Sequence, residues 1–322
     1  MNRFALITLI FSAIVICTSC GKNKEESEEK YESKIIEGLT LENYPRVDGS
    51  TSTEPLNALI ACKLLGISYE WAYSDTRSWG IEPILQKKNT GIFQNRIKSS
   101  QTHESFINLI DKKTSLILSA RTMSPDEKNY AKAAGVTLIE TPIALDAFVF
   151  VINPDNPVES LTIEQIEDIY TGKITNWKEV GGNDSEINPY VRNANSGSQE
   201  TMESLVMKDL PIMEFPIAQE RVVHSMVGVI DVLIRDINSI CYTFFYYKEQ
   251  ILRDLLTKTI AIEGIYPNKN TIFHISYPYV SEVYAVIRSD LDESSMAYQV
   301  YEWLQTAEGK YVINESGYLP AD

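Results

Sequence analysis

Histidine and cysteine are scarce in this chain, and those beyond the first twenty residues form no metal-binding or redox pattern. The 322 residues include 3 His and 4 Cys. Beyond the first twenty residues only Cys62 and Cys241 remain, and no Cys-x-x-Cys or His-Glu-x-x-His motif occurs there. Metal and redox sites depend on such spacings, so the sequence predicts neither a bound metal nor a cofactor. Two buried free thiols are the plain interpretation, although an exported protein also permits a disulfide between them.

Positive charge is also in short supply. The chain carries 29 Lys and Arg against 44 Asp and Glu, a net charge of −15, and no basic cluster interrupts this acidic composition. Proteins that bind phosphodiester backbones present such clusters. The composition therefore argues against nucleic acid as a partner.

Long hydrophobic runs are limited to one, near the N-terminus. Residues 4–17 are almost continuously apolar and follow a short basic start. A run of about 14 residues is shorter than the roughly 20 needed to span a bilayer, which indicates an export signal. Cys20 follows two small residues and resembles the lipidated cysteine of a bacterial lipoprotein, with residues 1–19 as the cleaved signal peptide. An ordinary cleavable signal with an incidental cysteine is the alternative.

The next stretch, residues 20–34, is polar, charged and nearly free of apolar side chains. Such a segment buries too little surface to offset its ordering entropy, so we expect a flexible tether. A lipid anchor and a tether place the globular body outside the cytoplasmic membrane, at the cell surface or in the periplasm.

A nucleophile elbow of the form Gly-x-Ser-x-Gly is absent as well. His103, His224 and His274 are scattered, without a recognisable catalytic acid beside a nucleophile. Covalent catalysis by serine needs such partners. The sequence therefore favours a binding protein over an enzyme.

What is present is an alternation of apolar, strand-like runs with amphipathic helical segments, which is typical of an α/β protein. The predicted strands are residues 115–119, 147–152, 242–247 and 283–287. Helix-start signals precede or open four helices, and glycines end three of them. The start signals are at Thr53, Ser124, Thr162 and Ser196, and the glycines are Gly66, Gly135 and Gly172.

Two of these helix starts carry more hydroxyl groups than a cap requires. Residues 48–53 read Asp-Gly-Ser-Thr-Ser-Thr, and residues 192–198 read Arg-Asn-Ala-Asn-Ser-Gly-Ser. A helix N-terminus presents unpaired N–H donors and a partial positive charge, and an Arg guanidinium matches a tetrahedral oxyanion. Each segment alone is more often an ordinary cap than a site. Together they favour an anion-binding site.

Further segments follow the first of these in a characteristic order: Thr102-His103, residues 153–157, residues 170–177 and Gly181-Gly182, before residues 192–198. This order resembles the phosphate-binding substrate-binding proteins of ABC transporters, over nearly the whole body from Tyr44 to Pro320. The Tyr-Thr-Gly-Lys-Ile-Thr-Asn-Trp sequence at 170–177 is the most distinctive part, as a structural signature rather than a ligand contact.

The resemblance implies a two-lobed α/β fold of the periplasmic-binding-protein type II class, with a ligand cleft between lobes joined by a two-strand hinge. Lobe one would comprise residues 35–145 and 251–322, and lobe two residues 146–250. It further implies a non-enzymatic, monomeric receptor that binds inorganic phosphate, or a similar tetrahedral oxyanion, and delivers it to the permease of an ABC importer.

The resemblance also transfers a set of ligand-binding residues: Ser52, Thr53, Thr102, Arg192, Ser196, Gly197 and Ser198. Ser196 caps its own helix, so its hydroxyl has two alternative roles. Where family members commonly carry an Asp, this chain reads Ser119-Ala120-Arg121. We hypothesise that Arg121 contributes to the anion site.

Two alternatives stay open on the sequence. One is an anion sensor or surface binding lipoprotein that works without a transporter. The other is a related two-lobed protein for a larger ligand, because Trp71, Tyr73 and Trp79 offer aromatic surface for a wider cleft. Core packing is the plain interpretation of those aromatic side chains.

Overall fold

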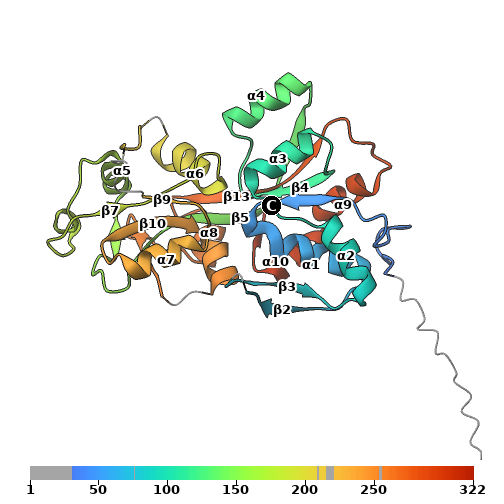
Figure 1. The fold of residues 1–322 in the computed structure, drawn as a ribbon, viewed down its shortest axis with the longest axis horizontal. Helices are drawn as coiled ribbons and strands as arrows, with labels where there is room; N and C mark the ends of the chain where they lie inside the picture. The colour runs from blue at the N-terminus through green and yellow to red at the C-terminus, as the bar shows by residue number, and fades with distance from the viewer. Residues whose placement is uncertain (1–30, 76, 209, 215–220, 254–255) are drawn as a thin grey trace, which may run out of the picture.

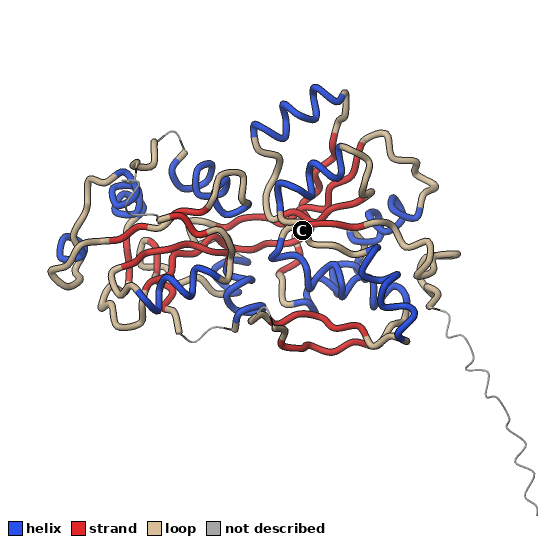
Figure 2. Tube along the Cα trace, in the orientation of Figure 1, coloured by secondary structure: helices blue, strands red, loops and turns tan. Residues whose placement is uncertain are grey.

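One long strand, β5 (Leu138–Ile152), runs through both halves of the molecule. Its residues 138–147 pair antiparallel with β13 (Val280–Arg288), and its residues 148–152 pair antiparallel with β10 (Ser239–Phe244). Figures 1 and 2 show the two halves side by side, with β5 and β13 at their junction. The two-lobed α/β architecture expected from the sequence is confirmed.

The pairings build a mixed sheet in the order β1-β4-β13-β5-β10-β7. β1 (Val47–Gly49) and β4 (Leu116–Ser119) are parallel, as are β7 (Asn188–Pro189) and β10. Two short strands, β11 (Lys258–Thr259) and β14 (Leu319–Pro320), also pair with β5. Residues 148–152 of β5 are buried apolar side chains, which is typical of a strand covered on both faces.

The computed structural model describes residues 31–322 except 76, 209, 215–220 and 254–255. The predicted signal peptide and Cys20 lie outside the described residues. Tyr31 and Ser33, expected in the tether, are instead buried against the body, where the Ser33 N–H donates to the Leu39 carbonyl over 2.8 Å. The folded body therefore begins no later than Tyr31. Within the part of the chain described, no helix combines the length and apolar character needed to cross a membrane.

Lobe one surrounds the β1, β4, β13 and β14 end of the sheet (Figure 1). A two-stranded hairpin of β2 (Tyr69–Tyr73) and β3 (Trp79–Pro83) packs on α1. The helices are the 3-10 turn η1 (Thr51–Thr53), α1 (Glu54–Leu65), α2 (Lys87–Arg96), α3 (Thr102–Ile110), α4 (Pro125–Ala134), α9 (Met296–Leu304) and α10 (Ala307–Ser316).

Lobe two surrounds the β10 and β7 end. Two further strand pairs belong to it: β6 (Ser160–Leu161) with β12 (Ala261–Ile262), and β8 (Val191–Arg192) with β9 (Val222–Val223). The helices are α5 (Ile163–Thr171), the 3-10 turn η2 (Trp177–Val180), α6 (Gly197–Thr201), the π-helical η3 (Met202–Met207), α7 (Gly228–Arg235), the π-helical η5 (Tyr247–Leu252) and α8 (Lys269–Phe273).

The boundary between the lobes differs from the one expected near residue 251. Strand β11 pairs with Val151 and Ile152 of β5, and β12 pairs with β6, so residues 258–262 lie with lobe two. The chain returns to lobe one with β13, because all of β13 pairs with residues 138–147 of β5 or with β4. We therefore propose that lobe two comprises residues 148–279 and lobe one the remainder of the described body.

The helix signals of the sequence are confirmed where they are strongest. Ser124 and Thr162 both form capping boxes, with Glu127 and Gln165 respectively. Gly66, Gly135 and Gly172 each adopt a left-handed conformation just after a helix. The strand predicted at 242–247 is shifted, because β10 ends at Phe244 and the chain turns helical directly afterwards.

The distinctive 170–177 segment is structural, as expected. Tyr170 and Trp177 are buried, and the Trp177 indole N–H donates to the Asn238 carbonyl over 2.9 Å. Cys62 and Cys241 are buried and free, so the described structure contains no disulfide between them.

Candidate functional site

A cavity of about 250 Å³, which we call the interlobe cavity, lies where the two lobes meet. Lobe one contributes the turn after β1, the start of α3 and Ala120 after β4, and lobe two contributes the end of β8, the start of α6 and residues 224–227. The cavity brings together six of the eight expected ligand-binding residues: Ser52, Thr102, Arg192, Ser196, Gly197 and Ser198.

Asp48 and Ser50 hold the lobe-one wall in shape. One carboxylate oxygen of the buried Asp48 accepts the backbone N–H groups of Gly49 and Ser100, each over 2.8 Å. The Ser50 hydroxyl lies 2.8 Å from Thr102 Oγ1 and accepts the Ala120 N–H over 3.0 Å. Three segments distant in sequence are thereby joined around one rim of the cavity.

Ser52 presents a buried hydroxyl that the described protein leaves unsatisfied. The residue is 1% exposed, and its Oγ has no hydrogen-bond partner among the described residues. An unsatisfied buried polar group costs about 1–3 kcal/mol, so its place at a cavity favours a water molecule or a ligand that completes it. Ser52 lines the interlobe cavity, where a ligand oxygen is the partner it lacks.

Arg192 supplies a buried cation on the opposite wall. It is 7% exposed, and its Nε donates to the Val223 carbonyl over 2.7 Å. Its backbone N–H is held by Gln199 Oε1 and the Tyr242 hydroxyl, both at 2.9 Å. Among the described residues no carboxylate forms an ion pair with its guanidinium, and burial lowers the pKa of Arg192. A buried charge without a counter-ion is costly, so this position favours an anionic ligand.

The two walls approach each other closely at Gly197. A Cβ atom at this position would lie 2.4 Å from Thr102 Oγ1, closer than such atoms approach. Glycine is therefore required for this contact between the lobes. The neighbouring Ser196 hydroxyl accepts the Gln199 N–H over 3.2 Å, so it does act as the cap of α6.

Thr53 and Arg121 do not line the interlobe cavity. Thr53 Oγ1 lies 2.9 Å from the carbonyl oxygens of Ser50 and Leu118, where it stabilises the turn into α1. The Arg121 guanidinium makes a bidentate ion pair with Glu127, at 2.7 and 2.8 Å, and is 8% exposed. Burial alone would raise the pKa of Glu127, but the hydrogen bonds and charge of Arg121 lower it. We therefore leave both residues out of the site.

Several residues that line the cavity were missed from the sequence: Ser50, Thr51, Glu54, Gln101, His224, Ser225, Met226 and Tyr247. Ser50 and Thr51 belong to the hydroxyl-rich run and were available from it. His224 to Met226 lie in a loop without a capping signature, and Tyr247 lies in the helical turn that was predicted to be strand. Among the described residues, no group of His, Cys, Asp or Glu is arranged to hold a metal ion.

The geometry is that of a binding protein: two α/β lobes meet around a small cavity with a buried cation and hydroxyl groups from both sides. A family model described as a PBP superfamily domain matches residues 70–308, about three quarters of the chain. The chain belongs to the PBP superfamily.

Curated relatives carry the name phosphate-binding protein PstS. The Bacillus subtilis protein is 22% identical over 99% of this chain and 94% of its own length. The Borreliella burgdorferi protein is 27% identical over 56% of this chain, and that match spans 65% of the relative's length. The resemblance noted from the sequence is confirmed, and these names describe binding proteins rather than enzymes.

Solved structures of low identity share the fold. A substrate-binding protein from Clostridium perfringens, solved with bound phosphate, has a TM-score of 0.64 at 22% identity, over 86% of this chain and 98% of that one. An ABC-type phosphate transport receptor from Vibrio cholerae has a TM-score of 0.60 at 22% identity, over 85% of this chain and 98% of that one. At such identities the matches establish the fold of this chain.

Proposed function

We propose that this protein binds inorganic phosphate, or a similar tetrahedral oxyanion, in the interlobe cavity and delivers it to an ABC importer. The curated relatives are named phosphate-binding proteins, and the Vibrio cholerae structure is named a phosphate transport receptor. The proposal assigns no covalent step, since capture and release suffice for a receptor.

The observation that carries the proposal is Arg192, buried in the cavity without a carboxylate partner in the described structure. Its two terminal nitrogens have no hydrogen-bond partner among the described residues and are free to donate to a ligand. Charge-assisted hydrogen bonds contribute about 1.5–3 kcal/mol each, so a few of them sustain micromolar binding after entropic costs.

The remaining contacts in the proposal come from both lobes. Ser52 and Thr102 donate from lobe one, and Ser196, Gly197 and Ser198 from lobe two, all lining the one cavity. Because neither lobe holds a complete site, ligand binding favours the closed arrangement by differential contact. The hinge at β5 and β13 is part of this proposal.

The N-terminal anchor belongs to the proposal as well. Lipidation of Cys20 would tether the body outside the cytoplasmic membrane, where a receptor meets its permease. The test is the Cys20→Ala variant in a bacterial host: wild-type protein in the membrane fraction and variant protein in the soluble fraction would support the anchor. Equal partitioning would contradict it.

The binding test is titration calorimetry of phosphate-free protein with phosphate and sulfate at two pH values. We expect phosphate to bind at micromolar or tighter affinity. Arg192→Lys keeps the charge but loses the planar fork, so we expect it to weaken binding at least about tenfold. Arg121→Lys is the matched control and should bind as the wild type does. Absence of phosphate binding, or equal affinity in the Arg192 variant, would refute the proposal.

A further inference from the structure

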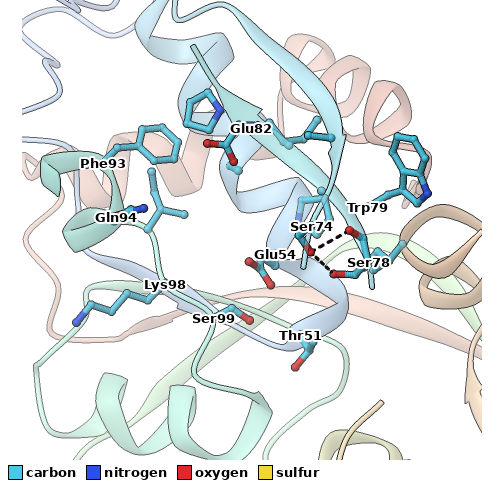
Figure 3. Close-up of a pocket in the computed structure, with 18 of the residues that line it drawn as sticks. Thr51, Glu54, Ser74, Ser78, Trp79, Glu82, Phe93, Gln94, Lys98 and Ser99 are labelled. Atoms are coloured by element: carbon cyan, nitrogen blue, oxygen red, sulfur yellow. Dashed lines mark hydrogen bonds between the residues drawn. The ribbon is translucent and has the colours of Figure 1, made fainter. Parts of the chain in front are cut away.

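A second cavity adjoins the interlobe cavity on the lobe-one side. It has a volume of about 650 Å³ and lies between the β2–β3 hairpin, the start of α1, α2 and η5 (Figure 3). We call it the hairpin cavity. Thr51, Glu54, Ser78 and Tyr247 line both cavities, so the two spaces are neighbours along these four side chains.

The size of the hairpin cavity exceeds what a bare oxyanion needs. Its 650 Å³ is more than twice the 250 Å³ of the interlobe cavity that holds Arg192. Small-molecule sites commonly measure about 300–1,000 Å³. The hairpin cavity is therefore large enough for an organic group, and it adjoins the space at Arg192.

Hydrogen-bonding side chains from three elements line this space, and those of Glu82 and Gln94 are also open to solvent. In Figure 3 the labelled side chains of Glu54, Glu82 and Gln94 come from α1, β3 and α2 around one cavity. None of the three makes a side-chain hydrogen bond or an ion pair within the described part of the protein. The protein around Glu54 displaces water and thereby raises the pKa of its carboxyl group. Carboxylate oxygens accept but do not donate when ionised, so they match a ligand rich in hydroxyl donors.

The hairpin adds an aromatic wall. Tyr73 and Trp79 are partners across β2 and β3, with ring centroids 5.6 Å apart. Arg253 of lobe two stacks over Trp79 at 4.4 Å and over Trp71 at 5.1 Å, which holds the hairpin against lobe two. Aromatic rings provide flat apolar surface with little entropy to lose, against which the C–H face of a sugar or polyol packs.

We propose that the site also takes phosphomonoesters of polyhydroxylated alcohols, such as sugar phosphates. The phosphoryl group occupies the interlobe cavity at Arg192, and the hydroxylated group occupies the hairpin cavity between Trp79 and the acceptors Glu54, Glu82 and Gln94. This inference rests on the proposed function, since the same Arg192 holds the phosphoryl group of either ligand.

The test is titration calorimetry of the phosphate-free purified protein with inorganic phosphate, glucose 6-phosphate, O-phosphoethanolamine and glucose. We expect phosphate and glucose 6-phosphate to bind and glucose alone to show no binding.

Trp79 and Glu82 line only the hairpin cavity. Trp79→Ala and Glu82→Gln should therefore each weaken the affinity for glucose 6-phosphate about tenfold and change the affinity for phosphate less than about twofold. Arg192→Ala should abolish the binding of both phosphate and glucose 6-phosphate. Tyr311→Ala, at a position 67% exposed on α10, is the control that should change neither.

The outcomes separate the two proposals. Phosphate binding without glucose 6-phosphate binding would overturn this inference and leave the proposed function standing. Binding of neither would overturn the proposed function and the inference with it. Glucose 6-phosphate binding that is unchanged in both hairpin variants would refute the placement. Tighter binding of O-phosphoethanolamine than of glucose 6-phosphate would show that the carboxylates select a cation and would refute the polyol class.

Discussion

At the scale of single residues, the site combines one unpaired cation with one unpaired hydroxyl. Arg192 and Ser52 line the same cavity from different lobes. Among the described residues the Arg192 charge has no ion-pair partner and the Ser52 hydroxyl has no hydrogen-bond partner. Folding alone gains nothing from leaving polar groups in this state. The free-energy cost of burying these two groups is offset when a ligand supplies oxygen atoms and negative charge.

The Ser52→Ala variant tests whether the Ser52 hydroxyl donates to the ligand. We expect phosphate affinity to fall by about tenfold or more, because a hydrogen bond to a charged ligand contributes about 1.5–3 kcal/mol. The free energy of unfolding without phosphate should not fall, since the variant removes an unsatisfied hydroxyl. Thr53→Val is the contrast: its hydroxyl lies on two carbonyl oxygens, so this variant should destabilise the protein. Calorimetry and denaturant unfolding measure the two quantities, and a stability loss in Ser52→Ala would contradict the assignment.

At the residue scale, Asp146 should also make the stability of the protein depend on pH. It is buried on β5, where its Oδ1 accepts the backbone N–H groups of Ala147 and Tyr246 and its Oδ2 has no partner among the described residues. Desolvation raises the pKa of Asp146 from 3.8 to about 7, because it outweighs those two donors. The folded protein therefore keeps a proton that the unfolded chain loses, and the free energy of unfolding falls as pH rises through this window.

We expect Asp146→Asn to remove this dependence. The difference in Tm between the variant and the wild type should grow in favour of the variant from about pH 5 to about pH 8. Asp292→Asn is the control, because hydrogen bonds from Ser294 lower the pKa of that exposed carboxyl and its contribution is constant in this range. Parallel Tm curves for Asp146→Asn and the wild type would contradict the prediction.

At the scale of elements, the close approach of α3 and α6 decides whether the lobes can meet. Gly197 opens α6, and a Cβ there would lie 2.4 Å from Thr102 Oγ1 at the start of α3. The contact joins elements of different lobes, so a clash there disturbs closure rather than the fold of either lobe.

Gly197→Ala is therefore expected to weaken phosphate binding about tenfold or more while leaving Tm without ligand nearly unchanged. Gly91→Ala is the matched control, because Gly91 lies in α2 with open space around its Cβ position. That control should bind normally and gain up to about 1 kcal/mol of stability, since Ala favours helix over Gly. Wild-type affinity in Gly197→Ala would show that the two lobes do not need this contact.

At the scale of the whole molecule, the β2–β3 hairpin joins lobe one to lobe two beside the cavities. Arg77 at its tip makes a bidentate ion pair with Asp231 of α7, with both N···O distances 2.8 Å. Their hydrogen bonds and charges raise the pKa of Arg77 and lower that of Asp231. The pair is largely open to solvent, so salt screens it.

We expect Asp231→Asn to speed phosphate release, with little effect on the association rate. The difference from the wild type should shrink as ionic strength rises, because screening removes the same interaction. Stopped-flow release at low and high salt measures this, with Asp155→Asn in an exposed turn as the control. An unchanged release rate at low salt would show that the hairpin does not restrain the lobes.

Local features were predictable where a few neighbouring residues decide the conformation. The capping boxes at Ser124 and Thr162 and the glycines after three helices needed only adjacent backbone groups, and each was found as expected. The end of β10 at Phe244 was not predictable, because the aromatic run that follows fits a strand or a buried helical turn equally well. Packing against lobe one selects the helical turn, where Tyr246 stacks on Tyr318 with ring centroids 3.5 Å apart.

What the sequence by itself determined is the α/β class and the hydroxyl-rich helix starts that line the cavity, because caps, glycines and alternating apolar runs act over short range. The two-lobed arrangement was expected from the family resemblance. What only the tertiary structure decided is which charges are left unpaired. Arg121 and Arg192 are equally basic in the sequence, yet Glu127 forms an ion pair with the first, whereas no described carboxylate forms an ion pair with the second. Electrostatic pairing depends on distances between segments far apart in the chain, and those distances exist only after folding.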